Sequence, residues 1–122
     1  MNVSEIKAFV LFQTGNDQED AGEFEPFLLD YINEGYDRLA FAHAKKHVEA
    51  GGEYPPLQAE DDEPNLPAWT HRAIANWAAW CVFRNGSPGR QNRGLAYRAA
   101  AEEATARILG GAAGARFVNA PR

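Results

Sequence analysis

Two histidines stand at a spacing that can bind a metal ion. His43 and His47 are four residues apart, so both imidazoles would share one face of a helix and could chelate a cation. The intervening residues, Ala44, Lys45 and Lys46, lack the glutamate of a metalloprotease HExxH motif, and a metal site needs a third ligand. We therefore expect no metal here, with His43 packed and His47 half-exposed.

One cysteine and a third histidine are the other reactive side chains. Cys81 could act as a nucleophile only with a histidine nearby in space, and its apolar neighbours predict a buried, inert thiol. His71 is expected as a neutral ring in the first turns of a helix. The sequence contains no G-x-S-x-G, Walker, G-x-G-x-x-G or CxxC motif. We predict no catalytic residue, no cofactor and no enzymatic activity.

Four arginines cluster in the second half of the chain: Arg84, Arg90, Arg93 and Arg98. Phosphate binding needs a continuous basic surface, which a chain with a net charge of −5 opposes. Arginine also pairs bidentately with carboxylates. The cluster is therefore a candidate site for DNA or, more simply, for an acidic segment of a neighbouring chain.

Length and composition limit the class of protein. The chain has 122 residues, 45% of them hydrophobic, and one cysteine. These values predict one compact domain without an intrachain disulfide, in a reducing compartment. The first residues lack the features of a secretion signal, and no stretch reaches the ~18 apolar residues of a membrane span. We expect a soluble, non-exported protein.

Charge is divided unequally along the sequence. Residues 1–66 carry 15 acidic and 4 basic side chains, a net charge of −11, whereas residues 67–122 carry 2 and 8, a net charge of +6. The two halves either neutralise each other within one molecule or meet between molecules. In the second case the contact is heterologous, and heterologous contacts that close form rings.

The first two helices follow from spacing and capping residues. A short helix is predicted over Ser4–Gln13 with Ser4 as N-cap, although the apolar run from Phe9 to Phe12 also allows a strand. Residues 14–20 are predicted to form a loop. A second, amphipathic helix is predicted over Glu25–Gly51, and Gly35 in its apolar stripe indicates close approach of another backbone.

Two further helices are predicted in the second half. The third, from about Pro67 to Asn85, is apolar on nearly all sides, which predicts that it is buried with Trp69, Trp77 and Trp80 at the core centre. The fourth runs from Pro88 to Leu109. Its seam of small residues allows another helix to approach closely: Gly94, Tyr97, Ala101, Ala104 and Ile108.

Two segments are predicted to lack regular structure. Residues 51–66 contain three prolines and the acidic run Glu60, Asp61, Asp62 and Glu63, and they form either a solvated linker or an arm that anchors in a neighbour through Tyr54 and Leu57. Residues 110–122 are predicted to be a flexible tail that docks on a partner through Arg116, Phe117 and Val118. The helical domain then spans residues 1–109.

The order of these segments resembles a known family. Tyr31–Arg38 (YINEGYDR), Leu66–Ile74 (LPAWTHRAI) and Arg90–Arg98 (RQNRGLAYR), within residues 3–109, are similar to the small head–tail connector (adaptor) proteins of tailed bacteriophages and prophages. This resemblance implies an all-α, four-helix bundle that assembles as a ring under the portal, extends the DNA channel and docks the next neck or tail component.

The resemblance also implies where the protein acts and with what. It implies the virion neck, and the host cytoplasm during assembly, as location. The implied partners are copies of the same chain, the portal and a downstream neck protein, with DNA only as cargo and no membrane. The alternative is a small helical adaptor or regulatory protein that binds one protein or DNA partner without forming a ring.

Overall fold

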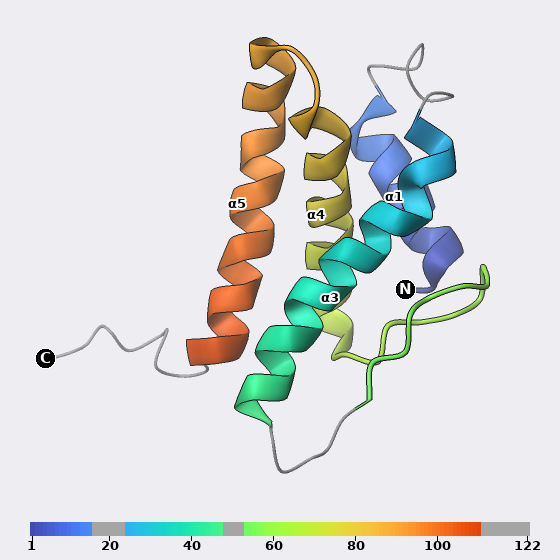
Figure 1. Cartoon of the computed structure of the whole chain (residues 1–122), viewed down its shortest axis with the longest axis vertical. Helices are drawn as coiled ribbons and strands as arrows, with labels where there is room; N and C mark the ends of the chain where they lie inside the picture. Colours follow the sequence, from blue (N-terminus) through green and yellow to red (C-terminus); the bar gives the residue numbers. More distant parts are fainter. Residues whose placement is uncertain (16–23, 48–52, 111–122) are drawn as a thin grey trace, which may run out of the picture.

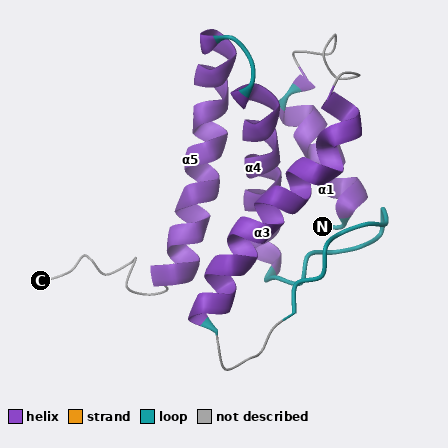
Figure 2. Cartoon of the chain, in the orientation of Figure 1, coloured by secondary structure: helices purple, strands orange, loops and turns teal. Residues whose placement is uncertain are grey.

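The computed structural model describes residues 1–15, 24–47 and 53–110, and these residues contain helices and connections but no strand. The helices are α1 (Val3–Gln13), α3 (Leu28–Lys46), α4 (His71–Arg84) and α5 (Pro88–Gly110), as Figure 1 and Figure 2 show. Short 3-10 turns, η2 (Glu25–Phe27) and η4 (Ala68–Thr70), lead into α3 and α4. The predicted all-α class is confirmed, and the first segment is a helix rather than a strand.

Helix α4 lies at the centre of the molecule. It packs against α5, α3 and α1, and Figure 1 shows it between α5 and the other two helices. Ten of its fourteen residues are buried, so the prediction of a helix covered on nearly all sides is confirmed. The main core lies where α1, α3 and α4 meet, and its largest fully buried side chains include Tyr36, Ile6, Leu28, Ile32, Leu39 and Ile74.

The prediction that three tryptophans form the core centre is wrong for two of them. Trp77 is buried, but Trp80 is half-buried and Trp69 is 47% exposed. Trp69 lies in η4, ahead of α4, where Arg107 of α5 covers its ring. Trp77 belongs to a second, smaller buried cluster with Cys81 and Ala101, and Trp80 packs against its edge.

Two glycines set the spacing of the helices around α4, as their positions in the apolar seams predict. A Cβ on Gly35 of α3 would lie 3.0 Å from the carbonyl oxygen of Ile74 and 3.1 Å from Cβ of Trp77. A Cβ on Gly94 of α5 would lie 2.7 Å from Cβ of Phe83. A methyl group on Gly94 would force its neighbours to shift and one on Gly35 would be tightly packed, so both glycines allow their helices to lie close to α4.

Several helix ends differ from the predicted ones, and α4 begins at His71, after the 3-10 turn η4, rather than near Pro67. Asn2 rather than Ser4 caps α1, because the Asn2 side chain accepts a hydrogen bond from the backbone of Glu5 and the Glu5 side chain accepts one from Asn2. The α-helical part of the second segment begins at Leu28 and ends at Lys46, short of Gly51, which lies outside the described residues. The last helix extends one residue further, to Gly110.

Some predictions fall on segments beyond the described ranges. Residues 16–20 of the predicted first loop and residues 111–122 of the predicted tail, with Arg116, Phe117 and Val118, lie outside the described residues. The division into a helical domain and a tail therefore stays a prediction.

Replacing Gly94 with alanine tests the close approach of α5 to α4. Helix propensity alone favours alanine by about 1 kcal/mol, but the added methyl group would meet Phe83 at 2.7 Å and Trp80 at 2.8 Å. Because such overpacking costs ~1–3 kcal/mol, we expect Gly94→Ala to lose about 1–2 kcal/mol of unfolding free energy, measured by denaturant and thermal unfolding.

Gly89→Ala is the matched control on the same helix, since a Cβ there has Ser87 Oγ at 4.0 Å as its nearest neighbour. We expect this variant to match or exceed the stability of the parent chain. Equal stability of the Gly94 and Gly89 variants would contradict the packing described here.

Candidate interaction surface

The histidine pair connects α3 to the segment that follows it. His43 is half-buried, and its Nδ1 lies 2.6 Å from the hydroxyl oxygen of Tyr54. His47 is exposed, and its ring centroid lies 4.3 Å from that of His43. Burial, together with His47, lowers the pKa of His43. Among the described residues, no group of three or more His, Cys, Asp or Glu side chains is placed to hold a metal ion.

The two other reactive side chains are both buried. The Sγ atom of Cys81 lies 3.6 Å from Oε2 of Glu34, and burial raises the pKa of this thiol to about 12. Cys81 is therefore protonated at neutral pH, in line with the predicted inert thiol. The Nε2 atom of His71 lies 3.0 Å from the carbonyl oxygen of Leu66, and its Nδ1 lies 2.8 Å from the amino nitrogen of Met1.

The carboxylate of Glu34, which belongs to no recognisable sequence motif, joins α3 to α4. Glu34 accepts hydrogen bonds from Nε1 of Trp77 at 2.8 Å and from both terminal nitrogens of Arg84, at 2.6 and 3.0 Å. Mainly because of the Arg84 hydrogen bonds, the pKa of Glu34 is lowered and that of Arg84 is raised. Arg84 is thus neutralised within its own chain, by a residue of the acidic half.

Every arginine in the described ranges lies over an aromatic ring. Arg38 lies 4.0 Å from the ring centroid of Trp77, Arg98 lies 5.4 Å from that of Trp80, and Arg107 lies 4.4 Å from that of Trp69. The remaining pairs are Arg72 with Phe9, Arg84 with Tyr31, and both Arg90 and Arg93 with Phe83. Such contacts contribute ~0.5–1 kcal/mol at exposed sites and hold the guanidinium plane in one orientation.

The predicted arginine cluster is only partly assembled. Arg90 and Arg93 both lie over the Phe83 ring, at 5.4 and 5.1 Å from its centroid. Arg98 follows along α5 and pairs with Glu102 at 3.3 Å. Arg84 lies apart from this group, because it is turned toward Glu34. The surface of α5 therefore presents three of the four predicted cations.

Residues 53–67, which connect α3 to η4, fold into a fixed acidic turn. A carboxylate oxygen of Asp62 accepts hydrogen bonds from the backbone N–H groups of Gln58 and Ala59, both at 2.8 Å, and these bonds lower the pKa of Asp62. Glu60 accepts a hydrogen bond from Nζ of Lys7 at 2.8 Å. The side chains of Asp61 and Glu63 are exposed.

The same turn supplies hydrogen-bond acceptors to the N-terminus of α1. The first backbone N–H groups of a helix lack acceptors within it. Here the backbone N–H of Val3 donates to the carbonyl oxygen of Asp62 at 2.9 Å. The backbone N–H of Ser4 donates to the carbonyl oxygen of Glu60 at 3.0 Å. The acidic segment is therefore part of the fold and is positioned against the first helix.

The interpretation of Tyr54 and Leu57 as anchors in a neighbouring molecule is wrong. Leu57 is buried in its own chain, and its backbone N–H and C=O both bond the side-chain amide of Asn33, at 2.9 and 3.0 Å. Tyr54 packs edge-on against Tyr36 and bonds His43. The side-chain amide of Asn33 thus forms hydrogen bonds with both backbone groups of Leu57. These two bonds attach residues 53–67 to α3.

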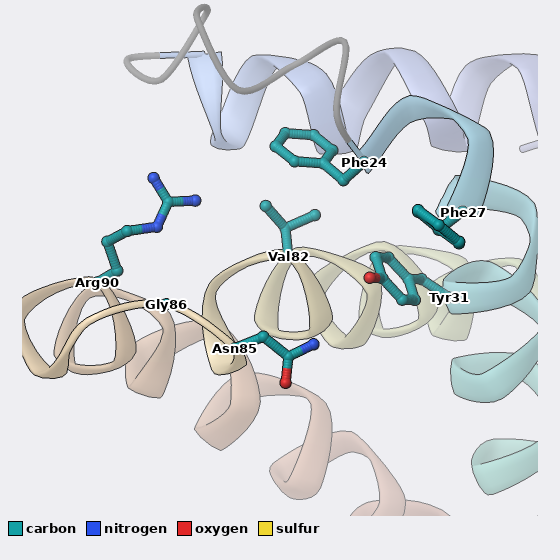
Figure 3. A pocket seen from close by; sticks show the side chains of 7 residues that line it. All are labelled: Phe24, Phe27, Tyr31, Val82, Asn85, Gly86 and Arg90. Atoms are coloured by element: carbon teal, nitrogen blue, oxygen red, sulfur yellow. The ribbon is translucent and has the colours of Figure 1, made fainter.

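The surface of the described residues includes two cavities with aromatic and cationic lining. One, of about 280 Å³, lies between the beginning of α3 and the end of α4, and Figure 3 shows its lining: Phe24, Phe27, Tyr31, Val82, Asn85, Gly86 and Arg90. The other, of about 190 Å³, is a groove between α3 and α5 lined by Arg38, Phe41, Ala42, Lys45, Thr105 and Leu109. Both combine apolar walls with cations: Arg90 in the first, and Arg38 and Lys45 in the second.

Comparison with known proteins assigns no family or function to these surfaces. No protein-family model, curated protein or solved structure matches the chain. Within the described ranges, none of the helices has the length and apolar character to cross a membrane.

The Glu34 network predicts a pH-dependent contribution to stability. The folded-state pKa of Glu34 lies below its ordinary value of 4.5, so its contribution is fully present above about pH 4.5 and is lost as the pH falls through the folded pKa. Glu34 and Arg84 side chains are 38% and 31% exposed, which screens the pair. We expect Glu34→Gln to cost about 1–2 kcal/mol at pH 7, measured by denaturant unfolding.

The difference in unfolding free energy between the parent chain and Glu34→Gln should shrink as the pH is lowered toward 3. The control is Glu102→Gln, which removes an exposed pair with Arg98 and should cost less than about 0.5 kcal/mol. A difference that is constant with pH would contradict the assigned role of the Glu34 carboxylate.

Asn33 provides a test of how the acidic connection is attached. Asn33→Ala removes both hydrogen bonds to the buried Leu57 backbone, for which we expect a loss of about 2 kcal/mol. We also expect faster proteolytic cleavage within residues 53–63. Asn92→Ala, at an exposed position of α5, is the control and should change neither quantity. Unchanged cleavage in the Asn33 variant would show that other contacts hold the connection.

Proposed function

We propose that this chain is a structural head–tail connector of a tailed phage, which assembles as a ring under the portal, extends the DNA channel and docks the next neck component. In this proposal, α1, α3, α4 and α5 form the four-helix bundle of the ring subunit. The observation that carries the proposal is that the acidic turn and the arginine-bearing helix α5 lie on opposite sides of a small helical fold.

The distribution of charge supports assembly rather than catalysis. The acidic turn at Glu60–Glu63 and helix α5, with its arginines, lie on opposite sides of the molecule in Figure 1. A subunit charged in this way attracts the next copy head to tail, which is the contact type that generates rings when the rotation closes. One ion pair, Glu34–Arg84, joins the acidic and basic halves within one molecule, and the proposal assigns the exposed carboxylates of the turn to contacts between molecules.

Within the ring, different charged groups serve different partners. Arg90, Arg93 and Arg98 lie on α5 with their guanidinium groups held over Phe83 and Trp80, which suits recognition of carboxylates on the portal or on the next neck component. In the proposal, residues 110–122 add a partner-binding tail through Phe117 and Val118. DNA passes through the channel as cargo.

A second candidate function is a small helical adaptor that binds one protein partner without forming a ring. The cavity of Figure 3 favours it, because the aromatic side chains of Phe24, Phe27 and Tyr31 and the cation of Arg90 line one concave site. Such a site fits one apolar side chain next to a carboxylate. The two functions differ in stoichiometry, which can be measured directly.

Light scattering and electron microscopy of the full chain, alone and with the portal protein encoded in the same genome, test the proposal. We expect ring-shaped oligomers, at high protein concentration or on the portal, that dissociate as salt is raised from about 0.1 M to 1 M. Arg90→Glu with Arg93→Glu should weaken portal binding, whereas Arg72→Glu, where the cation lies over Phe9 of α1, should not. A one-to-one complex without rings would support the adaptor instead.

A further inference from the structure

We propose that the acidic turn of one copy, Glu60–Glu63, binds in the groove between α3 and α5 of the next copy. The inference rests on the proposed function, because it assumes that copies of the chain associate, and it names the two surfaces that meet. The receiving site differs from the arginine cluster that the sequence indicates, since both of its cations come from the acidic half of the chain.

The groove has the chemistry of a site for an acidic segment. Arg38 and Lys45 flank it, and its lining contains no carboxylate. In the part of the chain that the structure describes, neither cation is paired with a carboxylate. In the same lining, Phe41 is 68% exposed and Leu109 is 44% exposed. Large apolar side chains exposed in the same lining as two cations are typical of a surface that a partner covers.

The turn that fits this groove is already ordered. The Asp62 carboxylate fixes its backbone through Gln58 and Ala59, and two backbone hydrogen bonds attach it to α1. Asp61 and Glu63 are exposed, and neither forms an ion pair within the described residues. An acidic element held in one conformation loses little entropy on binding. Its two carboxylates match the two cations of the groove in number and sign.

The position of both surfaces on α3 makes the contact intermolecular. Successive residues of a helix turn by about 100°, so Tyr36 and His43, which contact Tyr54 of the acidic connection, lie on one side of α3. Arg38, Phe41 and Lys45, which line the groove, lie on the opposite side. The turn and the groove of one molecule face away from each other. Contact between them in two copies is therefore heterologous and leaves one free turn and one free groove at the ends.

Charge reversal on each surface tests the contact. The turn variant is Asp61→Lys with Glu63→Lys, and the groove variant is Arg38→Glu with Lys45→Glu. We expect each to weaken self-association about tenfold or more at about 0.1 M salt, measured by sedimentation. Circular dichroism and thermal unfolding verify that each variant folds. Glu25→Lys with Asp30→Lys makes the same charge change at exposed positions near the start of α3 and should not weaken association.

Mixing the two variants distinguishes head-to-tail contact from other arrangements. Each variant keeps one functional surface, so an equimolar mixture should form one-to-one complexes that grow no further. Reversing all four charges in one chain should restore self-association. A mixture that forms no complex, or variants that associate as the parent chain does, would overturn the inference.

The apolar part of the groove has its own matched pair of variants. Phe41→Ser should weaken association, whereas Phe12→Ser, which removes an 84% exposed side chain at the end of α1, should not. If Phe41→Ser lowers thermal stability and leaves association unchanged, the groove is filled by the same chain and the inference is wrong.

The outcomes separate this inference from the proposed function. Rings that form equally well with the turn and groove variants would overturn the inference and leave the connector proposal standing. A one-to-one complex of the two variants, together with open chains rather than rings from the parent protein, would support the inference and contradict the ring. Absence of self-association under every condition, with or without the portal, would contradict both.

Discussion

Burial of an almost entirely apolar helix is the constraint on which the rest of this structure depends. Helix α4 has no polar side broad enough to face water, so α1, α3 and α5 must cover it together. Gly35 and Gly94 allow α3 and α5 to approach its backbone closely. Arginines cover side chains of α4 that the neighbouring helices leave open: Arg38 lies over Trp77 and Arg98 lies over Trp80. Aliphatic side chains therefore fill the core, and cation–π contacts cover the aromatic rings at its edge.

Covering α4 in this way gives α3 two different outer sides. One side binds the acidic connection through Asn33 and Tyr36, which places Glu60–Glu63 next to the start of α1. The other side faces α5 and carries the cations Arg38 and Lys45. Glu34 connects α3 to α4 through hydrogen bonds from Trp77 and Arg84. The separation between the acidic turn and the groove cations is thus a consequence of how α3 is held, and it is the basis of the proposed head-to-tail contact.

The sequence predicts those features that repeat along the chain and misses those that join distant parts of it. Helix periodicity and turn residues locate four helices, the buried α4 and the close approaches at Gly35 and Gly94. Periodicity cannot show that arginines shield Trp69 and Trp80, because the covering side chains come from another helix. Glu34 and its partners are 43 to 50 residues apart, so no local pattern connects them. Arg38 and Lys45 of the groove belong to the half of the chain whose net charge is negative, so the charge pattern does not indicate a site for an acidic segment there.

Hydrogen exchange at two protein concentrations, read by mass spectrometry, tests the central claim most directly. The account predicts that residues 58–63 and residues 38–45 both gain protection when the protein is concentrated enough to associate, since one copy's turn covers another copy's groove. The amides of α4 should exchange slowest in both conditions, because opening them requires global unfolding. Protection gained by only one of the two segments, or by neither while the protein associates, would contradict head-to-tail contact through these surfaces.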